Sequence, residues 1–192
     1  MRNLPLVLAS SSPRRFDLML EAGLNFTVVP PGVDEVHDEA APVAELTRQN
    51  AALKAEWVSD RYPDSWVIGA DTLVSIGRTA LGKPADLVDA RSMLRRLAGQ
   101  THEVGTAVCL IHAATGVRRE FLERTLVTFK PLNDAEINHY LTLINPFDKA
   151  GAYAAQEHGE VIIDRFEGTY SNVVGLPIER LLEELRVVGA IW

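Results

Sequence analysis

The spacing of hydrophobic positions changes several times along the chain, and each spacing predicts a different element. Short apolar, β-branched runs bounded by Gly, Pro or polar residues predict buried strands, whereas apolar residues three or four apart predict helices. The predicted strands cover residues 4–9, 26–30 and 160–168, the apolar segment 65–77 contains a strand that meets Asp71, and two long strands within 102–129 flank the turn AATG. The predicted helices cover residues 13–23, 43–62, 87–99, 133–144 and 177–189.

This alternation of strands and helices around a central hairpin predicts an α/β fold. The hairpin strands must run antiparallel, so we expect a mixed β-sheet with flanking helices rather than a strictly parallel sheet. The chain has 192 residues and contains no internal repeat, low-complexity tract or long linker. Because that length supports one domain, with or without two lobes, we expect a single domain over residues 1–192.

Composition and charge narrow the class of protein. Hydrophobic residues make up 47% of the chain and charged residues 23%, as in ordinary globular proteins. The net charge of −7 argues against a nucleic-acid partner, because proteins that bind backbone phosphates usually present a basic face. An acidic total still leaves room for a small basic pocket.

The cysteine content and the apolar runs bear on the compartment. Cys109 is the only cysteine, so no intrachain disulfide can form and a reducing compartment fits. The opening apolar run, LPLVLA, is shorter than the core of about 7–15 residues in a secretory signal, and no run approaches the ~20 residues of a membrane span. We expect a cytoplasmic protein with no membrane partner.

The stretch LASSSPRR joins the first predicted strand to the first predicted helix. Ser12 is a plausible N-cap, and Pro13 suits the first helical position. Arg14 and Arg15 then occupy the positive end of the helix dipole, which costs roughly 0.3–1 kcal/mol for each cation. A phosphate bound by the loop and the helix N-terminus would reverse that cost. Arginines pointing to solvent beside serines that only cap the helix explain the stretch equally well.

Two acidic positions follow predicted strands. Asp71, in VIGADT, falls at the predicted end of a strand, where open α/β sheets place their ligands, and the small Gly69 and Ala70 would let a ligand approach. An Asp that only closes a turn is the alternative. The pair Asp34–Glu35 could hold Mg²⁺ or orient a water, although a solvated loop is the commoner origin of such a pair.

Lys54, Lys83 and Lys149 are looser candidates for neutralising phosphate oxygens. Lys83 in LGKP and Lys149 in FDKAG lie in short loops bounded by Gly or Pro, but lysines are also the commonest surface residues. The five histidines show no metal-ligand spacing. The chain contains neither a P-loop nor a G-x-S-x-G nucleophile elbow, so a P-loop nucleotide site and a covalent hydrolase are poorly supported.

Taken together, these segments resemble the Maf-like nucleotide pyrophosphatases. LASSSPRR, VDE, NAALKA, VIGADTLV and LGKPAD occur in that family's order, and SMLRRLAGQTHEVGTAVCL, FDKAGAYAAQEHG and GTYSNVVGLPIERL follow. The resemblance covers nearly the whole chain, and eight segments in one order are highly specific. It implies two lobes around a central cleft, often as a homodimer.

The resemblance also implies a reaction, the hydrolysis of a nucleoside triphosphate between its α and β phosphates with the help of a divalent metal, Mg or Mn. Asp71 matches the family's proton acceptor, and Glu35 matches a carboxylate at the metal, so we expect Glu35 and Asp71 to share the ion. Lys54 and Lys83 match residues that hold the triphosphate and offset charge on the leaving pyrophosphate.

The residues themselves and the resemblance together indicate the substrate-binding residues. The turn from Ser10 to Arg15, with Arg14 in it, would clamp the phosphates, and Lys149 would add a further cation. Thr72 and Gln156, with Arg14, match positions linked to substrate choice. The motifs DKAGAY…Q and YSNVVGLP are similar to those of the branch that acts on dTTP and UTP. A Gln amide can form hydrogen bonds with the donors and acceptors of a pyrimidine.

Three alternatives remain open at this point. A non-catalytic nucleotide-binding regulator of cell division would keep the phosphate turn but need no general base. A pyrophosphatase for another modified nucleotide, such as N7-methyl-GTP, would keep the bond and change the base. A nucleic-acid-binding module is the third, and the acidic net charge disfavours it.

Overall fold

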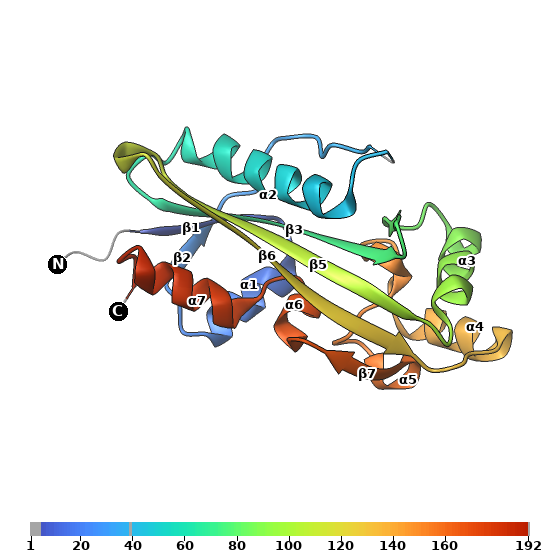
Figure 1. Cartoon of the computed structure of the whole chain (residues 1–192). Coiled ribbons are helices and arrows are strands. Elements are labelled where there is room, and N and C mark those ends of the chain that lie inside the picture. The colour runs from blue at the N-terminus through green and yellow to red at the C-terminus, as the bar shows by residue number, and fades with distance from the viewer. Residues whose placement is uncertain (1–4, 39, 192) are drawn as a thin grey trace.

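One seven-stranded sheet runs through the computed structural model, which describes residues 5–38 and 40–191 (Figure 1). The strands are β1 (Leu6–Ala9), β2 (Phe26–Val28), β3 (Trp66–Ile76), β4 (Thr79–Leu81), β5 (Thr101–His112), β6 (Val117–Phe129) and β7 (Ile163–Glu167). The helices are α1 (Pro13–Glu21), α2 (Val43–Ser59), α3 (Leu87–Leu97), α4 (Asp134–Leu143), α5 (Gly159–Ile162), α6 (Tyr170–Val174) and α7 (Ile178–Val187). Two short 3-10 turns, η1 (Ala113–Thr115) and η2 (Ala150–Ala152), complete the set.

The sheet is mixed, as predicted. Its strand order is β2-β1-β3-β5-β6-β7, with β4 paired to β3. β1 is parallel to both of its neighbours, and every other pairing is antiparallel. The connection through α1 leads from β1 to one side, and the connection through α2 returns to the other side, so the direction of the strand order reverses at β1.

Alternate residues of the central strands point to opposite faces of the sheet, and each face has its own helices. On one face, Val7 and Val67 pack against Ala51, Ala55 and Val58 of α2. On the other face, the neighbouring Leu6, Leu8 and Ile68 belong to a core cluster with residues of α1 and α7. Figure 1 shows α2 on one side of the strands and α1 and α7 on the other.

A further core cluster lies at the far end of the sheet and forms a second lobe (Figure 1). It gathers Leu94 and Leu97 of α3, Tyr140 of α4 and Tyr153 after η2 around the ends of β3, β5 and β6. The cleft described below lies between this cluster and the α1 side. No helix among the described residues has the length and apolar character needed to cross a membrane.

Most predicted elements are present, and the differences lie in short segments. The segment predicted as a strand over 160–168 begins as the helix α5 and becomes strand β7 only at Ile163. β4 and α6 were not predicted, because three or five residues are too few to show a period. α6 is held by tertiary contacts instead: Asn172 Nδ2 donates to the Val104 carbonyl and to Thr125 Oγ1, each at 3.0 Å.

Gly69 lets α2 approach the sheet closely. A Cβ at this position would lie 2.4 Å from the Ala51 carbonyl oxygen and 2.6 Å from the Ala55 nitrogen, both backbone atoms of α2. We therefore expect Gly69→Ala to destabilise the protein by about 3 kcal/mol, the upper end of the usual cost of overpacking. The midpoint of urea unfolding, at an unchanged slope, measures the loss. Gly82→Ala is the matched control, since a Cβ there would meet no atom of the described residues within 4 Å.

The buried imidazole of His102 makes the stability of the folded protein depend on pH. Burial lowers the pKa of His102 to about 4, and its Nε2 lies 2.8 Å from the hydroxyl of Tyr153. Between pH 6.5 and 4 the unfolded chain binds a proton that the folded protein excludes, so stability is full above pH 6.5 and falls as the pH drops. A shift of this size corresponds to about 3 kcal/mol.

The measurement is the free energy of unfolding at several pH values between 7 and 4. His102→Gln is expected to flatten that dependence, whereas the exposed control His139→Gln should keep it. A wild-type protein whose stability does not change over this range would contradict the assignment.

Candidate active site

A cleft of about 700 Å³ opens where β1 ends. Ala9, the last residue of β1, pairs with Gly69, and β3 continues beyond it until β4 pairs with Val74. Asp71 and Thr72 therefore lie on a stretch of β3 that has no neighbouring strand on that side among the described residues. The carboxyl end of a strand where the order reverses is the usual ligand site of an open α/β sheet.

This geometry corrects the predicted position of Asp71. The sequence placed it at the end of its strand, but Asp71 lies in the interior of β3 (Trp66–Ile76). The strand that ends at the cleft is β1, so the edge arises from the short length of β1 rather than from the end of β3.

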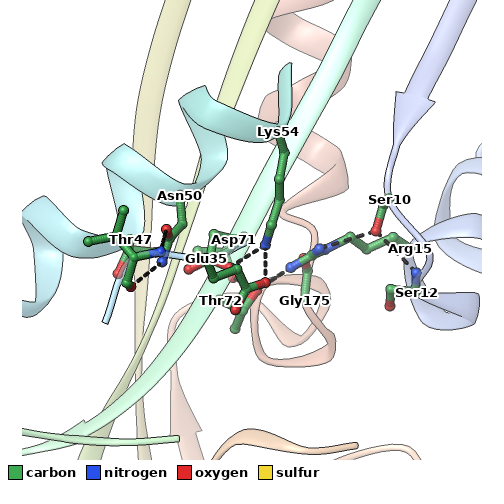
Figure 2. A network of polar contacts seen from close by, with 12 residues as sticks. Ser10, Ser12, Arg15, Glu35, Thr47, Asn50, Lys54, Asp71, Thr72 and Gly175 are labelled. Carbon is green, nitrogen blue, oxygen red and sulfur yellow. Dashed lines mark hydrogen bonds and ion pairs between the residues drawn. The ribbon is translucent and has the colours of Figure 1, made fainter. Parts of the chain in front are cut away.

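Asp71, Lys54 and Glu35 form the polar centre of the cleft. Lys54 extends from α2 so that its Nζ lies 2.7 Å from Asp71 Oδ1 and 2.5 Å from Glu35 Oε1 (Figure 2). Asp71 is only 5% exposed and Lys54 7%, so this pair is shielded from bulk water. Burial alone would raise the pKa of Glu35, but Lys54, with smaller contributions from Lys83 and Arg15, holds it below the usual value.

The loop that carries Glu35 is held by α2. Asn50, one turn before Lys54, accepts a hydrogen bond from the Val36 nitrogen at 2.8 Å and donates to the Val36 carbonyl at 3.2 Å. Asn50 and Lys54 are four residues apart and therefore lie on one face of α2. Asn50 binds the loop at Val36, and Lys54 binds Asp71 on the sheet. This anchoring explains how a carboxylate in a loop without regular structure meets a buried lysine.

Arg15 spans the other side of the cleft and does not point to solvent. Its Nε donates to the Gly175 carbonyl at 2.8 Å, and its two terminal nitrogens donate to Ser10 Oγ at 3.2 Å and to Thr72 Oγ1 at 3.1 Å (Figure 2). Burial lowers the pKa of Arg15, and the Asp71 carboxylate opposes that shift. Arg15 therefore ties the turn after β1 to β3 and to the end of α6.

The turn itself partly matches the predicted cap. Pro13 is the first residue of α1, and Ser12 is at the N-cap position, as predicted. The Ser12 side chain makes no capping hydrogen bond within the described residues; instead the Ser12 nitrogen donates to Ser10 Oγ at 3.1 Å. Arg14 extends to the opposite lobe, where its guanidinium lies 2.9 Å from Asp148 Oδ2.

A family model described as Maf-like protein matches residues 5–188 of this chain. The chain belongs to the Maf-like family. Three relatives named dTTP/UTP pyrophosphatase match nearly its full length. The protein of Akkermansia muciniphila is 45% identical over 96% of this chain and 97% of its own, and that of Halalkalibacterium halodurans is 44% identical over 96% of each. The protein of Pelotomaculum thermopropionicum is also 44% identical over 96% of each chain.

Among solved structures, the crystal structure of a Vibrio cholerae protein matches with a TM-score of 0.39 and 9% identity, over 74% of this chain and 72% of the other. Likeness at this level carries no conclusion about the Maf-like chain.

Every site residue predicted for this Maf-like chain lines the cleft. They are Ser10, Arg14, Arg15, Glu35, Lys54, Asp71, Thr72, Lys83, Lys149 and Gln156. Lys83 and Gln156 are exposed side chains there, from the loop after β4 and from the segment after η2. Asp34, the other half of the predicted acidic pair, does not line the cleft. Among the described residues, the lining therefore combines five cations with the carboxylates of Glu35, Asp71 and Asp148.

The two predicted metal ligands fit a divalent ion in this Maf-like site. Asp71 Oδ2 is buried and has no hydrogen-bond partner among residues 5–38 and 40–191, while Oδ1 is paired with Lys54. No group of three or more His, Cys, Asp or Glu side chains in the described part of the chain could hold a metal on its own. Two carboxylates completed by substrate phosphates and water is the usual arrangement for Mg²⁺.

Sequence reasoning missed Asn50, Asp148 and Gly175, which position the predicted residues rather than replace them. Asn50 lies within the motif NAALKA and Gly175 within YSNVVGLP, but neither residue has a role that the motif predicts. Asp148 directly precedes a lysine that was named as a candidate. Neither Asn50 nor Asp148 shows its partner by spacing, because those partners lie 14 and 134 residues away in the chain.

Proposed function

We propose that this Maf-like protein is a nucleoside triphosphate pyrophosphatase that hydrolyses dTTP and UTP between the α and β phosphates, giving the monophosphate and pyrophosphate. The observation that carries the proposal is the buried Asp71–Lys54 pair, joined to Glu35, at the head of a cleft lined by cations. The names of three relatives that match almost the full length support the same reaction.

The turn from Ser10 to Arg15 binds the phosphate chain in this proposal. The first turn of α1 leaves backbone N–H groups unsatisfied and is the positive end of the helix dipole. Arg14 and Arg15 add two guanidinium groups whose geometry suits phosphate oxygens. The hydrogen bonds that Arg15 makes to Ser10, Thr72 and Gly175 hold it ready at that position.

Asp71 takes the proton of the attacking water, and Glu35 and Asp71 hold a divalent cation, Mg or Mn. When bound, the cation would neutralise phosphate charge and lower the pKa of a bound water. The buried Oδ2 of Asp71 supports this role, since it has no hydrogen-bond partner within the described part of the chain and can accept a proton or a metal. Lys54 and Lys83 offset the charge that develops on the leaving pyrophosphate.

Recognition of the base falls to the other side of the cleft. Gln156 is an exposed amide there, and an amide offers both a donor and acceptors to a pyrimidine edge. From the facing strand β3, Thr72 adds a hydroxyl, although this hydroxyl already accepts from Arg15 and lies 2.9 Å from the hydroxyl of Thr106. Lys149 contributes a buried cation. We assign the choice of dTTP and UTP to this side.

A pyrophosphate-release assay tests the proposal. The protein is incubated with each dNTP, each NTP and N7-methyl-GTP, with Mg²⁺ or Mn²⁺ and in excess chelator. We expect release of pyrophosphate from dTTP and UTP with metal only. Preference for N7-methyl-GTP would contradict the assignment of a pyrimidine base. Binding without turnover would favour a nucleotide-binding regulator. Full activity in excess chelator would contradict the role of a divalent metal.

Four further properties are also proposals. We propose one domain over residues 1–192, and a single sheet that includes strands from Leu6 to Glu167 supports it. A cytoplasmic location, absence of a nucleic-acid partner and homodimer formation stay predictions.

A further inference from the structure

Asp148 has no part in the proposed reaction, yet it connects the two sides of the cleft. Its Oδ2 accepts a hydrogen bond from Arg14 at 2.9 Å, and its carbonyl oxygen lies 3.4 Å from another Arg14 nitrogen. Its Oδ1 accepts from Lys149 at 2.9 Å. Arg14 lies in the first turn of α1, whose Leu18 and Met19 belong to one core cluster, whereas Asp148 precedes η2, whose Ala152 belongs to another. A single carboxylate therefore joins the phosphate-binding turn to the opposite lobe.

The two contacts of Asp148 differ in strength. Lys149 is 4% exposed; its ammonium donates to the Asn145 carbonyl at 2.8 Å and to Asp148 Oδ1 at 2.9 Å, and it forms an ion pair with Glu157 Oε1 at 3.2 Å. These two hydrogen bonds and the ion pair hold the buried Lys149 ammonium within its own segment of the chain. The Arg14 contact is more open, with side chains 26% and 49% exposed, and such pairs contribute little to stability.

Asp148 is an anion under the conditions in which the protein would work. Burial alone would raise its pKa, but the hydrogen bonds from Lys149 and Arg14 hold that pKa below the usual value. A carboxylate and a phosphate use the same guanidinium N–H groups. Arg14 cannot give its full set of donors to a phosphate chain while Asp148 accepts from it.

We propose that Asp148 is a positioning residue that holds the Arg14 guanidinium at the mouth of the cleft until the phosphate chain of the nucleotide replaces it. The nature of the incoming anion rests on the proposed function. The Arg14–Asp148 contact is the weak one of the pair, and a charge-assisted bidentate contact to phosphate is stronger, so the exchange favours the nucleotide. Asp148 then stays with Lys149, next to the segment that carries Gln156.

The sign of one affinity change separates this role from a merely structural one. If Asp148 competes with phosphate for Arg14, removing its charge strengthens the binding of a phosphate chain. If Asp148 only supports the shape of the cleft, its removal weakens binding. The exchange also predicts that the gain depends on Arg14, because a general loss of negative charge would act without it.

The experiment measures the binding of sodium tripolyphosphate to the full chain by calorimetry, without nucleoside or added metal. We expect Asp148→Asn to lower the Kd by about twofold to fivefold, the range of a partly exposed ion pair. In an Arg14→Ala background the same substitution should give less than half of that gain in free energy, which a double-mutant cycle reports. Glu157→Gln is the matched control, because it removes a carboxylate from Lys149 but none from Arg14.

Asp148→Ser is measured in parallel and must change the Kd in the same direction. An unchanged or higher Kd in both Asp148 variants overturns the proposal, as does an equal gain without Arg14 or a total absence of tripolyphosphate binding. Tripolyphosphate binding requires no turnover, so it tests the role of Asp148 alone. Pyrophosphate release by the wild-type protein is measured separately and tests the proposed function.

Discussion

Asp71→Asn is expected to lower kcat for dTTP by about 10²- to 10⁴-fold, the usual contribution of a general base. The amide keeps the size of the side chain and can still accept from Lys54 through its oxygen, so the 2.7 Å contact to Nζ survives in altered form. The amide nitrogen that replaces one carboxylate oxygen can neither accept a proton nor bind a cation. KM should change much less than kcat, because the arginines that bind the phosphates are untouched.

Steady-state kinetics by pyrophosphate release, together with the binding of a non-hydrolysable triphosphate analogue, measure this effect. Asp134→Asn, a surface carboxylate paired with Arg95, is the control and should keep wild-type kinetics. Turnover by the Asp71→Asn protein at close to the wild-type rate would show that Asp71 is not the proton acceptor.

Lys54→Met is expected to lower kcat/KM by about 10²- to 10³-fold, the loss typical of one group that stabilises a developing charge. Lys54 is the cation between Asp71 and Glu35, at 2.7 and 2.5 Å. Without it the two carboxylates repel each other, and the pKa of Glu35 rises because burial is no longer opposed by the hydrogen bond from Lys54. The acidic limb of the pH–rate profile should therefore move to higher pH.

A pH series of kcat/KM for the variant and the wild type makes this measurement. Lys130→Met is the matched control, because its ammonium donates to the Glu160 carbonyl and the residue does not line the cleft. Lys54→Arg keeps a cation and should recover part of the activity. A profile in Lys54→Met with an unshifted acidic limb would contradict the electrostatic role.

Long, strongly periodic segments were predictable from the sequence, and short segments held by tertiary contacts were not. The two hairpin strands β5 and β6 and the helices α2, α3, α4 and α7 carry patterns long enough to define their type. α5 was mistaken for strand because GEVI ends in β-branched residues, while its conformation begins at His158 with φ 56°. Whether such a short segment forms a helix or a strand depends on how it packs against the rest of the lobe.

For the site, residue types were predictable and their pairing was not. The stretch LASSSPRR and the Asp of GADT pointed to the edge of the sheet where the cleft lies, although the strand that ends there is β1. The ion pairs of Lys54 with Glu35 and of Arg14 with Asp148 depend on how α2 and η2 pack, which no local pattern encodes. The unusual arginines of the first helical turn are explained in part by Asp148 and by the acceptors around Arg15.

The division of the cleft between two core clusters has an evolutionary consequence. Asp71 and Lys54, the proposed hydrolytic groups, sit on a strand and a helix that approach closely at Gly69, whereas Gln156 and Lys149 belong to an irregular segment of the other lobe. Exchange of residues 144–157 between relatives should retarget the protein to a different nucleotide while the bond that it cleaves stays the same. New substrates are thus accessible through changes in one loop.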